Sequence, residues 1–218
     1  MKTIGLITIG QSPRTDVTPD LEPIFGPDVK LLQAGALDGL TAQEIAAFAP
    51  EEGDYVLISK LRDGTSAVFA EKHILPRLQQ CIRELEDQGA ELIMFLCTGS
   101  FPAFESQVPL VFPCAVLNGT VPALAGRSRI GAITPKEEQI DQCAHKWKDY
   151  VQSVQVVAGS PYGEPEELDR AAKEMAGMDV DLVVLDCIGY TSAMKERVRQ
   201  LSGKPVVLSR TIAARGVM

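Results

Sequence analysis

The sequence has few of the residues that hold metal ions or form disulfide frameworks. Its 218 residues include two histidines, His73 and His145, and five cysteines that never occur as close pairs. Zinc sites and thiol–disulfide motifs usually need such pairs. We therefore expect reduced thiols and no bound metal.

Glycine-rich phosphate-binding loops and an excess of positive charge are also missing. The chain contains neither G-x-G-x-x-G nor G-x-x-x-x-G-K-[ST], so dinucleotides and nucleoside triphosphates lack their usual phosphate cradle. Its 21 basic and 29 acidic residues give a net charge of −8, which repels phosphate backbones and anionic lipid. We expect no nucleic-acid partner.

No long hydrophobic run is found. The apolar stretch in the opening "MKTIGLITIG" is too short for a signal-peptide core or a membrane span, so we expect no membrane partner and a cytoplasmic location. With 45% hydrophobic residues, the chain can bury about 70% of its unfolded surface as one large or two small domains.

Short β-branched apolar runs alternate with segments of helical period, which is typical of βα units around parallel sheets. The predicted strands are 3–9, 29–35, 55–59, 91–97, 111–117, 129–134, 154–159, 181–187 and 205–209. The predicted helices are 41–48, 70–88, 119–126, 135–151, 165–177, 191–202 and a last one from 211.

Two stretches of the sequence repeat one design. "TIGLITIG" opens the first half and "RIGAITP" the second, and the halves end in "ELIMFLCTGSFPA" and "DLVVLDCIGYTSA". This repeat predicts an α/β fold of two pseudo-symmetric, flavodoxin-like lobes with a cleft between them. The first lobe would comprise 1–117 plus 208–218, and the second 118–207. The two cysteine turns would then face each other.

Cys97 and Cys187 each stand at a predicted strand end, before a glycine turn and a helix start, where open α/β sheets bind ligands. A helix N-terminus can lower a thiol pKa and offer backbone N–H groups to a carboxylate. One thiolate could then remove a proton from carbon while the other thiol delivers one to the opposite face. Alternatively, both cysteines are small buried hydrophobes. Cys81 and Cys143 within helices, and Cys114 within a strand, are expected to be structural.

The turns "FLCTGS" and "LDCIGY" resemble the two cysteine motifs of the aspartate/glutamate racemase superfamily. Together with "TIGQSPRTDV" and "LRDGT", they resemble its AroM branch over nearly the whole chain. The resemblance implies an aspartate/glutamate racemase-like fold, no cofactor, a carboxylate ligand between the lobes, and catalytic positions for Cys97 and Cys187. The chain departs from the C-N-T and C-T-H or C-T-E motifs usual in amino-acid racemases, so no amino-acid substrate is implied.

Arginines follow three predicted strands. Guanidinium groups bind carboxylates bidentately, so three at one sheet edge suggest a ligand with more than one acidic group. Each could instead be solvated or paired with an acidic neighbour. The full set of predicted ligand contacts is Ser12, Arg14, Arg62, Thr98, Gly99, Ser100, Asn118, Thr120, Gly189, Tyr190, Thr191 and Arg210. The hydroxyl and amide residues among them are equally suited to helix caps and turns.

These patterns favour a cofactor-independent racemase or isomerase that acts on a small carboxylic acid, with amino acids and dicarboxylates among the options. Two alternatives stay open: a small-carboxylate binding protein with the same fold, and a decarboxylase that uses one cysteine. The sequence leaves the oligomeric state open, with a homodimer among the options.

Overall fold

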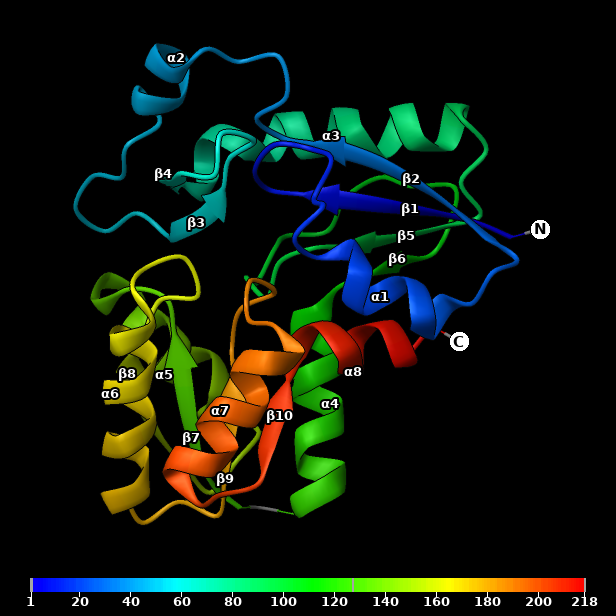
Figure 1. Cartoon of the computed structure of the whole chain (residues 1–218). Helices are drawn as coiled ribbons and strands as arrows, with labels where there is room; N and C mark the ends of the chain where they lie inside the picture. Colours follow the sequence, from blue (N-terminus) through cyan, green and yellow to red (C-terminus); the bar gives the residue numbers. More distant parts are fainter. Residues whose placement is uncertain (1, 127, 218) are drawn as a thin grey trace.

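Two four-stranded parallel sheets form the framework of the computed structural model, one above the other in Figure 1. The structure describes residues 2–126 and 128–217; Met1, Arg127 and Met218, which the predicted lobes include, lie outside them. The first sheet has the order β2-β1-β5-β6, with β1 (Lys2–Thr8), β2 (Val29–Gly35), β5 (Leu92–Phe95) and β6 (Leu110–Val111). The second has the order β10-β9-β7-β8, with β7 (Arg129–Thr134), β8 (Ser153–Ala158), β9 (Leu182–Leu185) and β10 (Val206–Leu208).

The central strands of the two sheets pair with their neighbours in the same way, which fits the predicted α/β fold with two parallel sheets. Ile4 of β1 pairs with Leu92 of β5, and Ile130 of β7 pairs with Leu182 of β9. From these pairs each central strand runs in step with its neighbour for four residues. Cysteine follows two residues after the end of β5 and two residues after the end of β9.

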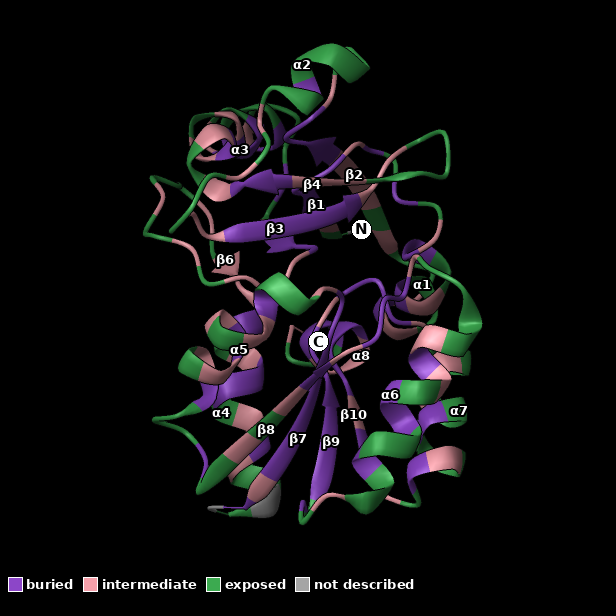
Figure 2. Ribbon diagram, turned by 90° about the vertical axis from the view of Figure 1, so that its left-hand side faces the viewer, coloured by how far each residue is buried: buried purple, intermediate pink, exposed green. Residues whose placement is uncertain are grey.

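Helices cover both faces of each sheet, which explains the almost continuous apolar runs of the strands. On the first sheet, α3 (Glu71–Asp87) packs against one face, and α1 (Thr18–Phe25) and α8 (Ser209–Arg215) against the other. On the second, α4 (Pro113–Ala125) and α5 (Ile140–Trp147) cover one face, and α6 (Pro165–Gly177) and α7 (Ser192–Ser202) the other. Figure 2 shows the buried strands β7 and β9 of the second sheet, and helices whose outer faces are exposed.

The last helix connects the two halves of the molecule. α8 lies where they meet and contacts both α1 and α4 (Figure 1). Ala213 and Ala214 belong to the apolar cluster under the first sheet, while Ile212 packs against the cluster of the second. The predicted lobe boundary at 117/118 falls inside α4, whose Leu117 and Val121 pack on the second sheet.

Three elements differ from the sequence-based expectations. The predicted strand 111–117 is a two-residue strand followed by α4, which begins at Pro113 because proline is preorganised for a first helical turn. Cys114 therefore lies in a helix, and its predicted place in a strand is wrong. α1 was not predicted, because Pro19 and Pro23 interrupt its helical pattern.

The third difference is a β-hairpin beside the first sheet. β3 (Val56–Lys60) pairs antiparallel with β4 (Ser66–Ala70), which was not predicted, and "LRDGT" forms the turn, with Gly64 at φ 89°. The short helix α2 (Ala42–Ala46) and a 3-10 turn (Glu137–Gln139) complete the elements of the described chain. No helix among the described residues is both long and apolar enough to cross a membrane.

Gly131 marks a close contact between β7 and the helix above it. A Cβ built there would lie 2.3 Å from Sδ of Met175 in α6, so the side chain of Met175 would have to move. We expect Gly131→Ala to lower the free energy of unfolding by about 1–3 kcal/mol, measured by urea denaturation. Gly177→Ala is the matched control, because that helical glycine has open space around it and should gain about 0.4–1 kcal/mol. Equal stability of both variants would contradict this packing.

Candidate active site

The two cysteine turns have the same local geometry. The backbone N–H of Gly99 donates to Sγ of Cys97 at 3.3 Å, and the N–H of Gly189 donates to Sγ of Cys187 at 3.3 Å. Each turn thus aims a thiol and a backbone donor away from the carboxyl end of its parallel strand. This is the edge at which open α/β sheets bind ligands.

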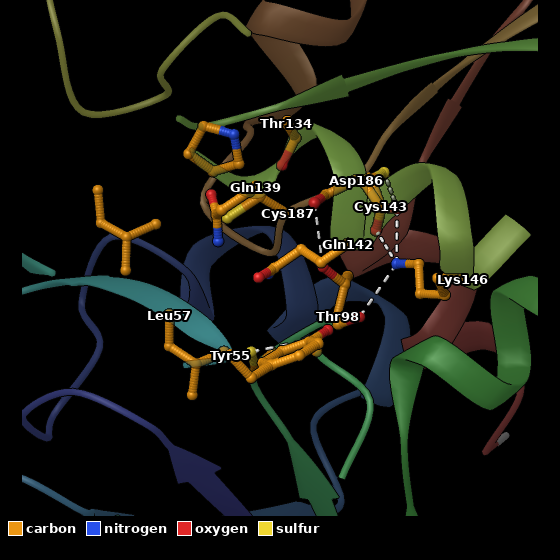
Figure 3. A pocket seen from close by; sticks show the side chains of 14 residues that line it. Tyr55, Leu57, Thr98, Thr134, Gln139, Gln142, Cys143, Lys146, Asp186 and Cys187 are labelled. Atoms are coloured by element: carbon orange, nitrogen blue, oxygen red, sulfur yellow. Dashed lines mark hydrogen bonds and ion pairs between the residues drawn. The ribbon is translucent and has the colours of Figure 1, made fainter. Parts of the chain in front are cut away.

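Both thiols line one cavity between the sheets. The cavity has a volume of about 40 Å³ and is drawn in Figure 3. A space of that size holds about three water molecules. Its lining residues are Tyr55, Leu57, Ile58, Cys97, Thr98, Gly99, Thr134, Pro135, Gln139, Gln142, Cys143, Lys146, Asp186 and Cys187.

A buried ion pair forms one wall of this cavity. Nζ of Lys146 lies 2.6 Å from the Asp186 carboxylate and also donates to the carbonyl oxygen of Thr98 at 3.1 Å (Figure 3). The indole N–H of Trp147 donates to Asp186 at 2.8 Å, and the Cys143 thiol donates to it at 3.3 Å. A buried carboxylate is tolerated only when it is paired in this way.

The ion pair also connects the two cysteine turns. Lys146 binds Thr98 in the first turn and Asp186 beside the second, and the Thr98 hydroxyl donates to the backbone carbonyl of Asp186 at 3.0 Å. Burial alone would raise the pKa of Asp186, but the Lys146 ammonium and the hydrogen bonds hold it below its usual value. The pair is therefore ionised at neutral pH.

Both thiols are less acidic than free cysteine. Burial raises the pKa of Cys97 to about 12, although the Gly99 N–H opposes this shift. Burial also raises the pKa of Cys187, against the opposing effects of the Gly189 N–H, the Tyr162 hydroxyl and the Arg14 charge. Each thiol therefore holds its proton at neutral pH, and removing one of these protons needs additional stabilisation of the thiolate.

The β-hairpin reaches across to the second lobe. Val56 of β3 donates its N–H to the Gln142 side chain at 3.0 Å, and its carbonyl accepts from Gln142 at 2.8 Å and from Gln139 at 3.1 Å. Tyr55 and Leu57, on either side of Val56, line the cavity. The hairpin thus closes the side of the cavity that the two parallel sheets leave open.

The three predicted arginines are paired with carboxylates of the protein. Arg14 is buried and binds Asp16 through two hydrogen bonds of 2.8 Å. Its guanidinium also donates to the hydroxyls of Thr8 and Ser59, each at 3.2 Å.

Arg62 and Arg210 are likewise engaged. Arg62 lies 2.6 Å from Asp38 and donates to the backbone oxygen of Ser12, whose own hydroxyl donates to Asp38 at 2.6 Å. Arg14 and Arg62 line a separate pocket of about 310 Å³ in front of β1. Arg210 is 1% exposed and lies 2.9 Å from Asp20.

Arg210 supports the second cysteine turn from behind. Its guanidinium donates to the backbone oxygens of Ile188 at 2.8 Å and Gly189 at 2.9 Å. It is not among the residues that line the cavity. This geometry fits a residue that holds the turn in place.

The remaining predicted contacts have local roles. The backbone N–H of Ser100 donates to the Tyr55 hydroxyl at 3.2 Å, and Asn118 donates to the Cys114 sulfur at 3.6 Å. Thr191 caps α7 by accepting from the N–H of Met194, and Tyr190 is a core residue whose hydroxyl binds the carbonyl of Gly159. Thr120 is half-buried on α4, outside the cavity lining. Ligand contacts by these residues stay predictions.

Several cavity residues were not predicted from the sequence. Lys146, Gln139 and Gln142 come from the segment after β7, and Tyr55 lies directly before β3. The helical period predicted a helix around Lys146, but not which of its residues face the other lobe. The described residues include no group of three or more His, Cys, Asp or Glu side chains arranged to hold a metal ion.

Solved structures of known proteins share this fold. A maleate isomerase from Pseudomonas putida S16 has a TM-score of 0.65 at 14% identity, and the match covers 99% of this chain and 91% of that one. Arylmalonate decarboxylase gives 0.63 at 17% identity, covering 98% and 89%. Glutamate racemase from Aquifex pyrophilus gives 0.61 at 17% identity, covering 99% and 82%. The α/β fold with two four-stranded parallel sheets is therefore aspartate/glutamate racemase-like.

The search of curated proteins found no match. The family model described as "AroM protein" matches residues 4–218, which include both sheets and both cysteine turns. The chain belongs to the AroM family.

Proposed function

We propose that this protein is a cofactor-independent enzyme that moves protons at a carbon atom beside a carboxylate, using the thiols of Cys97 and Cys187. The observation that carries the proposal is that two sheets of equal register deliver two thiols, each with a glycine N–H on its sulfur, to one cavity. A duplicated fold requires the apolar strand positions to match, but it does not require cysteine in both copies.

Two thiols in one cavity suit proton transfer on both faces of a carbon. One sulfur accepts a proton as a thiolate, and the other donates one as a thiol. The carboxylate of the ligand would be held by backbone N–H groups at the cysteine turns, which lie at the carboxyl ends of β5 and β9. The helix start predicted after Cys97 is wrong, because a loop and β6 follow that turn, whereas α7 begins five residues after Cys187. The structural neighbours include enzymes named for maleate, arylmalonate and glutamate, and we extend to this chain only the substrate class, a small carboxylic acid.

Solvent deuterium exchange with a panel of acids tests this proposal while the substrate is still unidentified. The protein is incubated in deuterated water with aspartate, glutamate, their hydroxy-acid analogues and maleate. At least one acid should take up deuterium at the carbon beside a carboxylate, detected by proton NMR or mass spectrometry. Exchange reveals proton transfer even when no net product forms.

The Cys97→Ser/Cys187→Ser double variant is the control for this experiment. Exchange that persists in the double variant would exclude the thiols as the proton carriers. If no acid exchanges but one of them binds in calorimetry, the protein is a carboxylate-binding member of the fold. Release of carbon dioxide from a malonate-type acid that depends on one cysteine would assign it as a decarboxylase.

A further inference from the structure

The two thiols have different polar neighbours beyond the shared glycine contact. The positive charge that acts on Cys97 is that of Lys146, whose Nζ lies 2.6 Å from the Asp186 carboxylate. Cys187 instead has a tyrosine hydroxyl at its sulfur, because the Tyr162 oxygen lies 3.8 Å from Sγ. Tyr55, the tyrosine on the Cys97 side, places its hydroxyl 3.2 Å from the backbone nitrogen of Ser100.

Tyr162 lies directly over the second cysteine turn. A Cβ built on Gly189 would be 2.4 Å from the Tyr162 hydroxyl oxygen, so glycine at this position leaves room for the tyrosine. Burial raises the pKa of Tyr162 above that of an ordinary tyrosine. The hydroxyl therefore keeps its proton and can donate it in a hydrogen bond to a thiolate.

Arg14 supports this arrangement from the other lobe. It lies in the loop after β1, is 3% exposed, and its positive charge acts on the Tyr162 hydroxyl. Its charge acts on Cys187 and is partly balanced by Asp16, which is more exposed. Asp186, beside Cys187 in the chain, would disfavour a thiolate there, but its charge is paired with Lys146. A nearby cation and a donated hydrogen bond both favour the charged form of a thiol.

We propose that Tyr162, supported by Arg14, makes Cys187 the thiol that loses its proton first, so that Cys187 is the base and Cys97 the acid of the resting protein. Tyr162 acts here as a positioning residue, through its hydrogen bond to the sulfur. The assignment of base and acid rests on the proposed function. The difference in acidity between the two thiols does not rest on that function, because it follows from the polar groups around each sulfur.

The proton balance of the step is closed. The Cys187 thiol first gives its proton to water. Its thiolate then takes the proton from the substrate carbon, so that the C–H bond breaks, an S–H bond forms, and the electron pair stays on the carbon beside the carboxylate. The S–H bond of Cys97 breaks as its proton goes to the opposite face of that carbon, which leaves a Cys97 thiolate. Proton exchange with water restores the starting state.

Site-resolved thiol reactivity tests the proposal without any substrate. The full chain is treated with methyl methanethiosulfonate between pH 6 and 10, and modification of each cysteine peptide is followed by mass spectrometry. The rate at Cys187 should rise at lower pH than the rate at Cys97. Tyr162→Phe should slow Cys187 about tenfold at pH 8, which corresponds to one pKa unit, and leave Cys97 unchanged.

Tyr55→Phe is the matched control, because it removes the other tyrosine hydroxyl near the same cavity. It should leave the pH profile of Cys187 where it is. The proposal is overturned if Cys97 reacts at lower pH than Cys187, or if Tyr162→Phe leaves the Cys187 profile in place. A change in rate without a shift along the pH axis also overturns it, since that reports access to the sulfur. None of these results depends on deuterium exchange, so the proposed function can fail or stand separately.

Discussion

Cys97→Ser and Cys187→Ser should each lower the rate of inversion at least about a hundredfold. The substrate in this measurement is the acid that exchanges deuterium. A serine hydroxyl is far too weak an acid to take the place of a thiolate near neutral pH. One of the two variants should retain exchange from a single face, because the remaining thiol still reaches its own side of the carbon. The measurement compares the rate of inversion by polarimetry with the rate of deuterium uptake.

Cys81→Ala is the control for general effects of removing a thiol. Cys81 is buried in α3 against the first core and is not among the residues that line the cavity. Its loss should leave inversion unchanged. Full inversion in either serine variant would show that the two-thiol mechanism is wrong, even if exchange itself is confirmed.

Lys146→Met should cost about 3–5 kcal/mol in the free energy of unfolding at pH 7. The substitution keeps most of the side-chain volume but leaves the Asp186 carboxylate, 1% exposed, without its cation. Adding Asp186→Asn should recover part of this loss, because both charges are then removed. Urea denaturation of the wild type, the two single variants and the double variant measures the coupling between the residues.

The cost of Lys146→Met should decrease as the pH falls toward 4. In the wild type, the lowered pKa of Asp186 contributes stability that is present above the pKa of an unfolded aspartate and is lost at lower pH. In the variant, burial without the lysine raises this pKa, so the carboxyl group is neutral in acid and its penalty disappears. Arg197→Met, which breaks the exposed pair with Asp169, should leave the unfolding midpoint unchanged at all pH values. If Arg197→Met lost as much unfolding free energy as Lys146→Met, burial of the Lys146–Asp186 pair would not be the cause of the loss.

The sequence predicted the framework well because strand periodicity and the internal repeat are local signals. β2 was predicted with its observed bounds, and both cysteines were placed at the carboxyl ends of strands. The hairpin was missed, although the Asp63-Gly64 turn between two apolar runs is a known hairpin signal. β4 was overlooked because its five residues join directly to α3.

The site itself was predicted less completely, since its walls come from elements that are far apart in the sequence. Lys146 and Asp186 lie 2.6 Å apart although they belong to different predicted elements. The arginines were predicted from their places after three strands and from the carboxylate-binding geometry of guanidinium. The sequence left open whether they pair with acidic neighbours, as Arg14 does with Asp16. The packing of the two lobes decides which charged groups find a partner inside the protein.

The equal register of the two sheets also bears on handedness. A rotation that exchanges the two lobes also exchanges the two sulfurs. The two configurations of a carbon atom likewise carry their hydrogen on opposite faces, so each configuration would present its hydrogen to a different sulfur. Thr98 and Ile188 occupy equivalent places after the two cysteines, yet one is a hydroxyl bonded to Asp186 and the other is an apolar core residue. Thr98 lines the cavity and Ile188 does not, so the two cysteine turns present different chemistry to a ligand. Under the proposed function, the two mirror forms of one acid would meet this difference from opposite sides and so bind unequally.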